Sequence, residues 1–193
     1  MHDTGDDQGE TSQLIRKSNR YVMKRICFIL LFALAAMYMK AQEIVPPTAS
    51  ETPQLEYVMQ LYVTLEPEYV VGEVPHGKRV VIPITGGIFE GPKLKGTIIP
   101  GGADYQYQKT DGKNLRTELE AIYSIKTDDG VYIHVRNCGI FSAGEQGFYF
   151  LTAPKFEAPE DSEYAWLNNA IFVCGPAPSE PNTVRLNIWK VVR

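Results

Sequence analysis

Short apolar runs recur along the chain from residue 54 to its end. In QLEYVMQLYVTL, every second residue from Leu55 to Leu65 is apolar, which is typical of a β-strand with one buried face. Later runs are rich in Val, Ile, Tyr and Phe, as strands are. The predicted strands cover residues 54–65, 79–84, 94–99, 118–126, 131–137, 147–157, 165–174 and 184–192.

Turn-forming residues separate these runs. Pro75-His76-Gly77 and Glu90-Gly91-Pro92 are examples, and TDDG at 127–130 predicts a hairpin between its two flanking strands. Beyond the N-terminal apolar run, no segment of ten or more residues has the 3.6-residue period of a helix. The pattern predicts an all-β fold: a single antiparallel β-barrel of about eight to ten strands with no substantial helix. A β-sandwich is the alternative, but bulky residues on both faces of several strands favour a barrel.

Glycine is concentrated in PITGGIFEGPKLKGTIIPGGADY, residues 83–105. Glycine inside a strand marks a bulge or a close approach of two backbones, so we interpret these glycines as bends in a coiled sheet. A bend at Gly101-Gly102 would point Asp104 into the barrel. The nearby GEVPHGKR is similar to a phosphate-binding loop, but Arg79 stands where a magnesium-binding hydroxyl is needed and a strand follows instead of a helix. We therefore exclude nucleotide binding.

The N-terminal segment differs in composition from the rest. Met23-Lys24-Arg25 precedes the apolar run ICFILLFALAA, which is typical of a secretory signal peptide. We predict a signal at 23–41, cleaved after Ala41, and a secreted or periplasmic protein that has no membrane attachment afterwards. A membrane anchor is the alternative, but residues 26–39 are fewer than the about 20 that span a bilayer.

Because a signal peptide normally begins a chain, we interpret residues 1–22 as a mis-annotated extension ahead of a true start at Met23. The Pro-rich residues 42–53 are a predicted linker, and 54–193 the predicted barrel domain. This part is long enough for one domain with a hydrophobic core.

The net charge of residues 42–193 argues against a nucleic-acid partner. The chain has 19 basic and 23 acidic side chains; residues 1–41 hold six and four of them, which leaves 13 and 19 in residues 42–193, a net charge of −6. An acidic surface repels phosphate backbones, so we expect no nucleic-acid partner. The two cysteines of this part, Cys138 and Cys174, would form a disulfide in an oxidising compartment or remain buried thiols.

Four carboxylates lie in strand-like runs: Asp104, Glu118, Glu120 and Glu157. A carboxyl group that faces an apolar interior has a raised pKa and can serve as an acid or a base near neutral pH. We predict catalytic roles for Asp104 and Glu157 and a ligand-binding role for Glu120. The alternatives are a solvated outer face for Glu118 and Glu120, and capping of backbone amides by Asp104 and Glu157.

Arg136 and Asn137 end the run VYIHVRN. Neighbours in a strand point to opposite faces, so at most one of them faces inward. Arg136 is a predicted catalytic residue that would bind a carboxylate or enolate oxygen, or else it pairs with Glu118 or Glu120. Asn137 is a predicted ligand-binding residue.

Tyr164, Trp166 and Asn168 are spaced by two and would share one face of a strand. Two aromatic rings and an amide suit a ligand-binding wall, so we predict this role for all three; the alternative is ordinary core packing. His76 and His134 lack the paired spacing of metal ligands, and we predict neither a metal site nor a cofactor.

Several runs carry a family resemblance: VPHGKRVVIPITGGIFEGPKLKGTIIPGGADY, TDDGVYIHVRNCG, YFLTAPKFE and YAWLNNAIFV. In this order they resemble the bacterial and fungal family known as domain of unknown function 3237, over roughly residues 55–192. The resemblance implies a compact β-barrel of largely uncharacterised function. The chain differs from the pattern at Tyr105, where Trp is usual, at Leu151, where Arg is frequent, and in a short loop at 142–147. The missing Arg weakens any inference of a shared anionic substrate.

The sequence thus supports three hypotheses on function. The first is a pocket that binds a small, partly apolar molecule. The second is a cofactor-free lyase, isomerase or cyclase, which convergence of Asp104, Arg136 and Asn168 would favour. The third is a structural or interaction protein. The chain leaves homo-oligomer formation open.

Overall fold

The computed structural model describes residues 16–28, 44–145 and 147–193. Residues 16–28 form an α-helix in an N-terminal unit that ends at Pro47, and Thr48–Arg193 form a second unit. The predicted cleavage site and residues 29–41 of the predicted signal lie outside the described residues. In the part that is described, no helix combines the length and the hydropathy that crossing a membrane requires.

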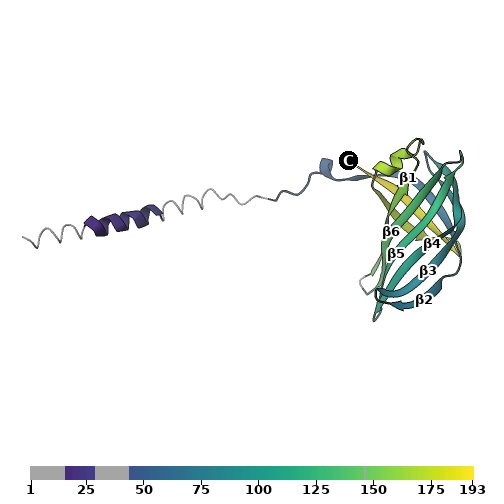
Figure 1. Cartoon of the computed structure of the whole chain (residues 1–193), viewed down its shortest axis with the longest axis horizontal. Helices are drawn as coiled ribbons and strands as arrows, with labels where there is room; N and C mark the ends of the chain where they lie inside the picture. The colour runs from purple at the N-terminus through teal and green to yellow at the C-terminus, as the bar shows by residue number, and fades with distance from the viewer. Residues whose placement is uncertain (1–15, 29–43, 146) are drawn as a thin grey trace, which may run out of the picture. The chain divides into compact units, whose positions relative to one another are not determined.

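Nine antiparallel strands make up the second unit (Figure 1). Two short 3₁₀ helices, η1 and η2, accompany them. The elements are η1 (Ala49–Glu51), β1 (Gln54–Leu65), β2 (Tyr69–Val74), β3 (Gly77–Glu90), β4 (Lys95–Asp111), β5 (Asn114–Thr127), β6 (Tyr132–Gly144), β7 (Gly147–Glu157), η2 (Ala165–Asn169), β8 (Phe172–Pro178) and β9 (Thr183–Val192).

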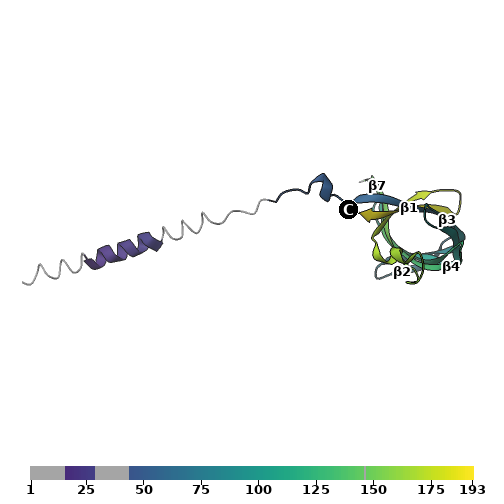
Figure 2. The same cartoon turned by 90° about the horizontal axis from the view of Figure 1, so that it is seen from above.

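The sheet closes on itself. Its strand order is β1-β9-β8-β7-β6-β5-β4-β3-β2, and β1 also pairs with β3. Eight strands therefore form a closed barrel, which Figure 2 shows nearly end-on, and β2 is an additional strand on β3. This confirms the predicted all-β barrel. The segment that is similar to a phosphate-binding loop forms the β2–β3 hairpin, in which Val74 pairs with Gly77.

A bulge in β1 changes which residues face inward. The pairing of β1 with β9 shifts register between Tyr57 and Met59, so Val58 and Met59 are both buried. As a result Leu55 and Tyr57 are 57% and 44% exposed, whereas Met59 and the alternating residues after it point into the barrel. The predicted single apolar face for 54–65 is therefore wrong in its first half, because one extra residue inverts the alternation.

The glycine-rich bends lie in β3 and β4, as predicted. Pairing between these strands shifts register between Pro83 and Gly87, and the pairing of β4 with β5 shifts between Ile99 and Ala103. At Gly102 an added Cβ atom would lie 2.5 Å from the carbonyl oxygen of Ile122, so no larger residue fits without a backbone shift. The bend carries the chain directly to Asp104.

One end of the barrel is filled by core side chains and covered by η2. Leu167 of η2 is buried in the same hydrophobic cluster as Phe156 and Phe172, whose rings meet edge to face at 5.0 Å. The prediction of one strand over 165–174 is wrong for its first half, because residues 165–169 are helical and β8 begins at Phe172.

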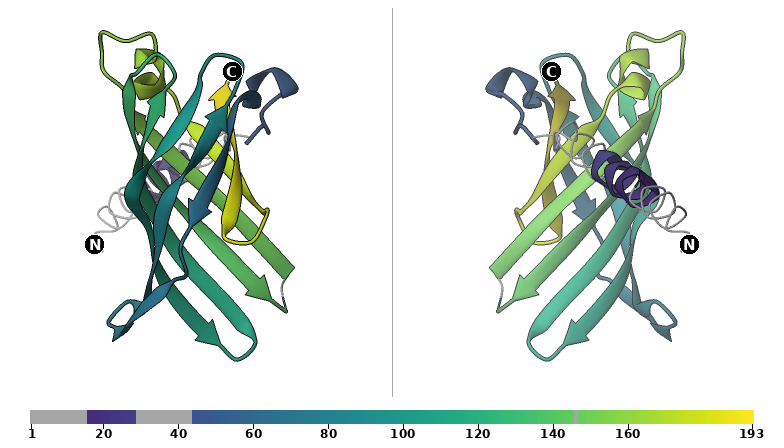
Figure 3. Two further views of the ribbon diagram at one scale, coloured as in Figure 1. Left: turned by 90° about the vertical axis from the view of Figure 1, so that its right-hand side faces the viewer. Right: turned by 90° about the vertical axis from the view of Figure 1, so that its left-hand side faces the viewer.

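The wall is loosest between β7 and β8. Only Thr152 and Cys174 pair across this boundary. Pro176 has no N–H to donate to a facing strand, which explains why the pairing does not continue. Figure 3 shows the β8–β9 hairpin ending well short of the β4–β5 and β6–β7 hairpins at the same end. The barrel is thus packed at the η2 end, and its wall is shorter at β8 and β9 towards the other end.

Candidate functional site

A cavity of about 240 Å³ lies inside the barrel, lined by inward-facing strand residues. We call it the lumen cavity. Its wall is mostly aliphatic and aromatic, and all eight strands of the closed barrel contribute to it. The lining residues are Val63, Leu65, Ile82, Ile84, Asp104, Gln106, Leu119, Ala121, Tyr123, Asn137, Phe150, Thr152, Pro176, Val184 and Leu186.

Asp104 supplies the one carboxyl group of this lining. Its Oδ2 accepts a hydrogen bond from Gln106 Nε2 at 2.7 Å, and Gln108 Nε2 in turn donates to Gln106 Oε1 at 3.0 Å. Asp104 Oδ1 is buried and has no hydrogen-bond partner among the described residues. Burial raises the pKa of the Asp104 carboxyl, while the hydrogen bond from Gln106 lowers it in part. This group is suited to hold a proton that an ordinary aspartate would lose.

Asn137 and Thr152 line the same cavity from β6 and β7. Asn137 is only 3% exposed and Thr152 only 4%. Asn137 Oδ1 and Thr152 Oγ1 also lack a hydrogen-bond partner within the described part of the chain. We call Asp104 Oδ1, Asn137 Oδ1 and Thr152 Oγ1 the three lumen acceptors. Buried polar atoms are nearly always hydrogen-bonded, and the neighbouring group that contacts Asn137 and Thr152 is the weakly donating Cys174 thiol.

Two weak acids lie beside the three lumen acceptors. Burial raises the pKa of the fully buried Cys174 thiol to about 11, against the lowering effects of Thr152 and Asn137. Burial also raises the pKa of the Tyr123 hydroxyl, and the nearby Cys174 and Asp104 add to the effect. Both groups therefore stay neutral at physiological pH, and the lumen has no charge other than that of Asp104.

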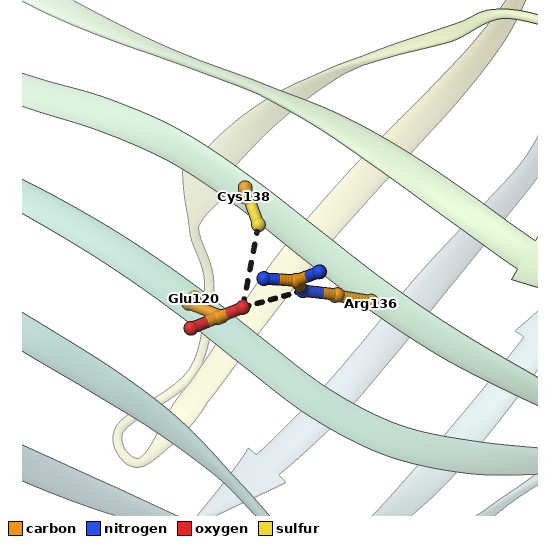
Figure 4. A network of polar contacts seen from close by, with 3 residues as sticks. All are labelled: Glu120, Arg136 and Cys138. Carbon is orange, nitrogen blue, oxygen red and sulfur yellow. Dashed lines mark hydrogen bonds and ion pairs between the residues drawn. The ribbon is translucent and has the colours of Figure 1, made fainter.

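Arg136 and Glu120 lie on the outer face of the barrel and not in the lumen. Arg136 Nε donates to Glu120 Oε1 at 2.5 Å, and Cys138 Sγ lies 3.8 Å from the same oxygen (Figure 4). This hydrogen bond raises the pKa of the exposed Arg136, and burial raises the pKa of Cys138. The structure thus places Asn137 inward and Arg136 outward, and Arg136 makes the ion pair that was the alternative to catalysis.

Glu157 is exposed at the end of β7, where it pairs with His134 of β6, and it does not line the lumen cavity. Asn168 is exposed in η2, where it bonds both backbone groups of Ala158 at 2.8 and 2.9 Å. Asp104, Arg136 and Asn168 therefore do not converge. The catalytic constellation that these three residues would have made is absent from the described structure.

Tyr164, Trp166 and Asn168 do not form a wall of the lumen. Because they precede or lie in a 3₁₀ helix, residues spaced by two do not share a face, and this part of the prediction is wrong. Tyr164 is buried and its hydroxyl donates to Asp129 Oδ1 at 2.9 Å, while the Trp166 ring lies 6.1 Å from Phe172. Their contacts are those of core packing and loop fixation.

Sequence reasoning missed Gln106, Tyr123, Thr152 and Cys174. The period of two along β4 would have identified Gln106 once Asp104 was assigned inward. The others come from strands whose register relative to β4 is set only by long-range pairing. Within the described chain, no three His, Cys, Asp or Glu residues lie close enough together to hold a metal ion.

The chain is similar to proteins of one family whose function is unknown. The family described as "Protein of unknown function (DUF3237)" matches residues 53–191. A UPF0311 protein of Clostridium acetobutylicum is 33% identical over 151 residues, which are 70% of this chain and 92% of the relative. A crystal structure of a conserved protein of unknown function from Rhodopseudomonas palustris aligns with a TM-score of 0.65 and 30% identity, over 73% of this chain and 99% of that one.

A more distant relative has a named activity. A protein of Penicillium herquei called a hydroalkoxylation enzyme is 28% identical over 139 residues, which cover 72% of this chain and 84% of that protein.

Proposed function

We propose that this chain, which belongs to the DUF3237 family, binds a small, largely apolar molecule in the lumen cavity of its barrel. One observation carries the proposal: the three lumen acceptors line an otherwise apolar cavity, and beyond the Cys174 thiol, which contacts Asn137 and Thr152, the described chain gives them no hydrogen-bond partner. A ligand with an apolar body and at least one hydrogen-bond donor would satisfy both parts of this wall.

The size of the cavity limits the ligand. A volume of about 240 Å³ equals the liquid volume of about eight water molecules. A molecule of one or two rings fits, and a long lipid or a peptide does not. Phe150 and Tyr123 supply aromatic contact area, whereas Asp104 and Asn137 would fix orientation.

Binding is tested with a neutral two-ring fluorescent probe, 1-aminonaphthalene, and the barrel unit, residues 48–193. This unit is suitable because the matched 73% of this chain corresponds to 99% of a solved relative. We expect saturable fluorescence enhancement, and its loss in Ala121→Phe, which fills the cavity between Asp104 and Asn137. The matched control is Ala153→Phe on the exposed outer face of β7. Unsaturable enhancement, or equal binding by both variants, would contradict the proposal.

A second candidate function is cofactor-free catalysis by proton transfer. It is supported by the raised pKa of Asp104 in an apolar cavity and by the name of the Penicillium herquei relative. Hydroalkoxylation adds the O–H bond of an alcohol across a carbon–carbon double bond, which gives an ether. Asp104 as the neutral acid would donate its proton to one alkene carbon, the hydroxyl oxygen would bond to the other, and the hydroxyl proton would return to the Asp104 carboxylate.

This second candidate is tested in D₂O with hydroxyl-bearing alkenes that displace the fluorescent probe. We expect a cyclic ether with one carbon-bound deuterium, detected by NMR, and no such product with Asp104→Asn. Formation of the ether at the same rate by Asp104→Asn would refute the role of Asp104 as the acid.

We also propose that residues 23–41 direct secretion, as the basic start and the apolar run suggest. Expression of the full chain in a bacterial host and sequencing of the mature N-terminus tests this. A mature chain that begins at Gln42 supports it, and an intact N-terminus on cytoplasmic protein contradicts it.

A further inference from the structure

The three lumen acceptors lie around one small residue. Asp104 of β4 pairs with Ala121 of β5, and Ala121 pairs with Asn137 of β6. The methyl group of Ala121 leaves room between the carboxyl and the amide. Thr152 is placed next to this row because it pairs with Gly139, two residues along β6 from Asn137. The acceptors therefore face a common space from three strands.

The space they face contains one carboxyl group and no positive charge. Gln106 Nε2 is already bonded to Asp104 Oδ2. No Lys, Arg or His is among the described residues that line the cavity. The other titratable groups near Asp104 are Tyr123 of β5 and Cys174 of β8, and both stay neutral because burial raises the pKa of each. The strands β1, β3 and β9 contribute only aliphatic side chains to this wall.

Resting on the proposed binding function, we propose that the polar group of the ligand is a primary ammonium. An ammonium group brings a positive charge, which the Asp104 carboxylate would balance, and N–H donors for the unpartnered Asp104 Oδ1. A hydroxyl group brings a donor but no charge to balance an ionised Asp104. A carboxylate or phosphate would bring a second negative charge beside Asp104. The ring faces of Tyr123 and Phe150 suit a cation with a small apolar body.

Burial of a cation is costly unless it is paired and hydrogen-bonded, so ammonium binding requires the ionised form of Asp104. The bound amine and the Asp104 proton thus compete. Affinity for the amine should fall as pH is lowered through the raised pKa of Asp104, a range in which an aliphatic amine stays protonated. Affinity for a neutral ligand of the same shape should not follow this dependence.

The experiment compares 2-phenylethylamine with 2-phenylethanol, which share one apolar body, by calorimetry on the barrel unit between pH 4 and 8. At pH 7.5 we expect the amine to bind about tenfold more tightly or better, since one charge-assisted interaction corresponds to at least that factor. The variant Asp104→Asn should lower amine affinity to that of the alcohol. Thr152→Val, which removes one acceptor at constant shape, should weaken the amine more than the alcohol.

The matched control is Glu118→Gln, which removes an exposed carboxylate from the outer face and should leave both affinities unchanged. Equal or tighter binding of the alcohol by the wild type overturns the ammonium assignment and favours the second candidate function. Equal loss of amine binding in Glu118→Gln also overturns it, because the effect would then come from surface charge. If neither ligand nor the fluorescent probe binds, the proposed binding function itself fails.

Discussion

Replacing Asp104 by Asn removes one ionisable group from the lumen at nearly constant shape. The Asn side chain can keep its oxygen towards Gln106 and so preserve the hydrogen bond that Asp104 Oδ2 accepts at 2.7 Å. Its NH₂ group then takes the place of Oδ1 at the cavity. The variant cannot ionise, and at the cavity it presents an N–H donor where the wild type has an acceptor. The part of its effect that depends on pH therefore reports the energetic cost of ionisation.

The sign of the effect follows from the direction of the shift. Burial raises the pKa of Asp104 above its ordinary 3.8, so the folded chain binds this proton more tightly than the unfolded chain does. Relative to the variant, the wild type is most stable below 3.8. It loses stability as pH rises from there through the raised pKa, and above that the difference is constant. Each tenfold gain in proton affinity corresponds to about 1.4 kcal/mol. At pH 7 the free energy of unfolding of the variant should therefore exceed that of the wild type by about 1.4 kcal/mol for each tenfold by which folding strengthens proton binding to Asp104.

The assay is urea unfolding of the barrel unit, followed by tryptophan fluorescence at half-unit steps between pH 3.5 and 8. The control is Glu118→Gln. Arg116 lowers the pKa of Glu118, so its contribution is present above the unfolded value and is lost only in acid. Above about pH 5, the difference in unfolding free energy between Glu118→Gln and the wild type should therefore not change with pH. Identical pH dependence of Asp104→Asn and the wild type, or lower stability of the variant at pH 7, would refute the reasoning.

Three further changes test the surroundings of the site. Asn168→Ala should lower the free energy of unfolding by about 1–3 kcal/mol, because two backbone groups of Ala158 lose their partner; probe binding should persist, and Asn169→Ala should have little effect. The Cys174 thiol, fully buried with a pKa of about 11, should resist iodoacetamide until urea unfolds the barrel, as mass spectrometry would show. Gly102→Ala should destabilise the barrel by about 1–3 kcal/mol in urea unfolding, because its Cβ would lie 2.5 Å from a facing carbonyl oxygen.

The bounds of a strand were predictable where turn residues flank it on both sides. The bounds of 54–65 and 147–157 agree with β1 and β7, because turn residues flank both segments. Strand β4 is longer than predicted, since it continues through Pro100-Gly101-Gly102 as a bulge in place of ending there. The segment 165–169 was misassigned because its apolar residues suit a 3₁₀ helix that caps a barrel as well as they suit a strand.

The site was only partly predictable, because its residues are brought together by register. Asp104 follows a glycine bend that the sequence displays, and Asn137 was one of two adjacent candidates of which at most one was expected to face inward. Local pattern gives no sign that Asp104 and Asn137 flank the same alanine. That relation follows from two cross-strand pairings, each determined by the closure of the whole barrel.

The inner and outer polar groups of this barrel differ in what they need from their surroundings. On the outer face Arg136 and Glu120 satisfy each other in contact with water, and such exposed pairs contribute little to stability. Inside, the three lumen acceptors have no partner in the described chain. At about 1–3 kcal/mol for each unsatisfied atom, their cost without external partners would be about 3–9 kcal/mol, comparable to the whole stability of a domain. Stability therefore does not explain why a Thr, an Asn and an Asp line an apolar lumen; under the proposed binding function, a ligand that donates hydrogen bonds to them would offset this cost.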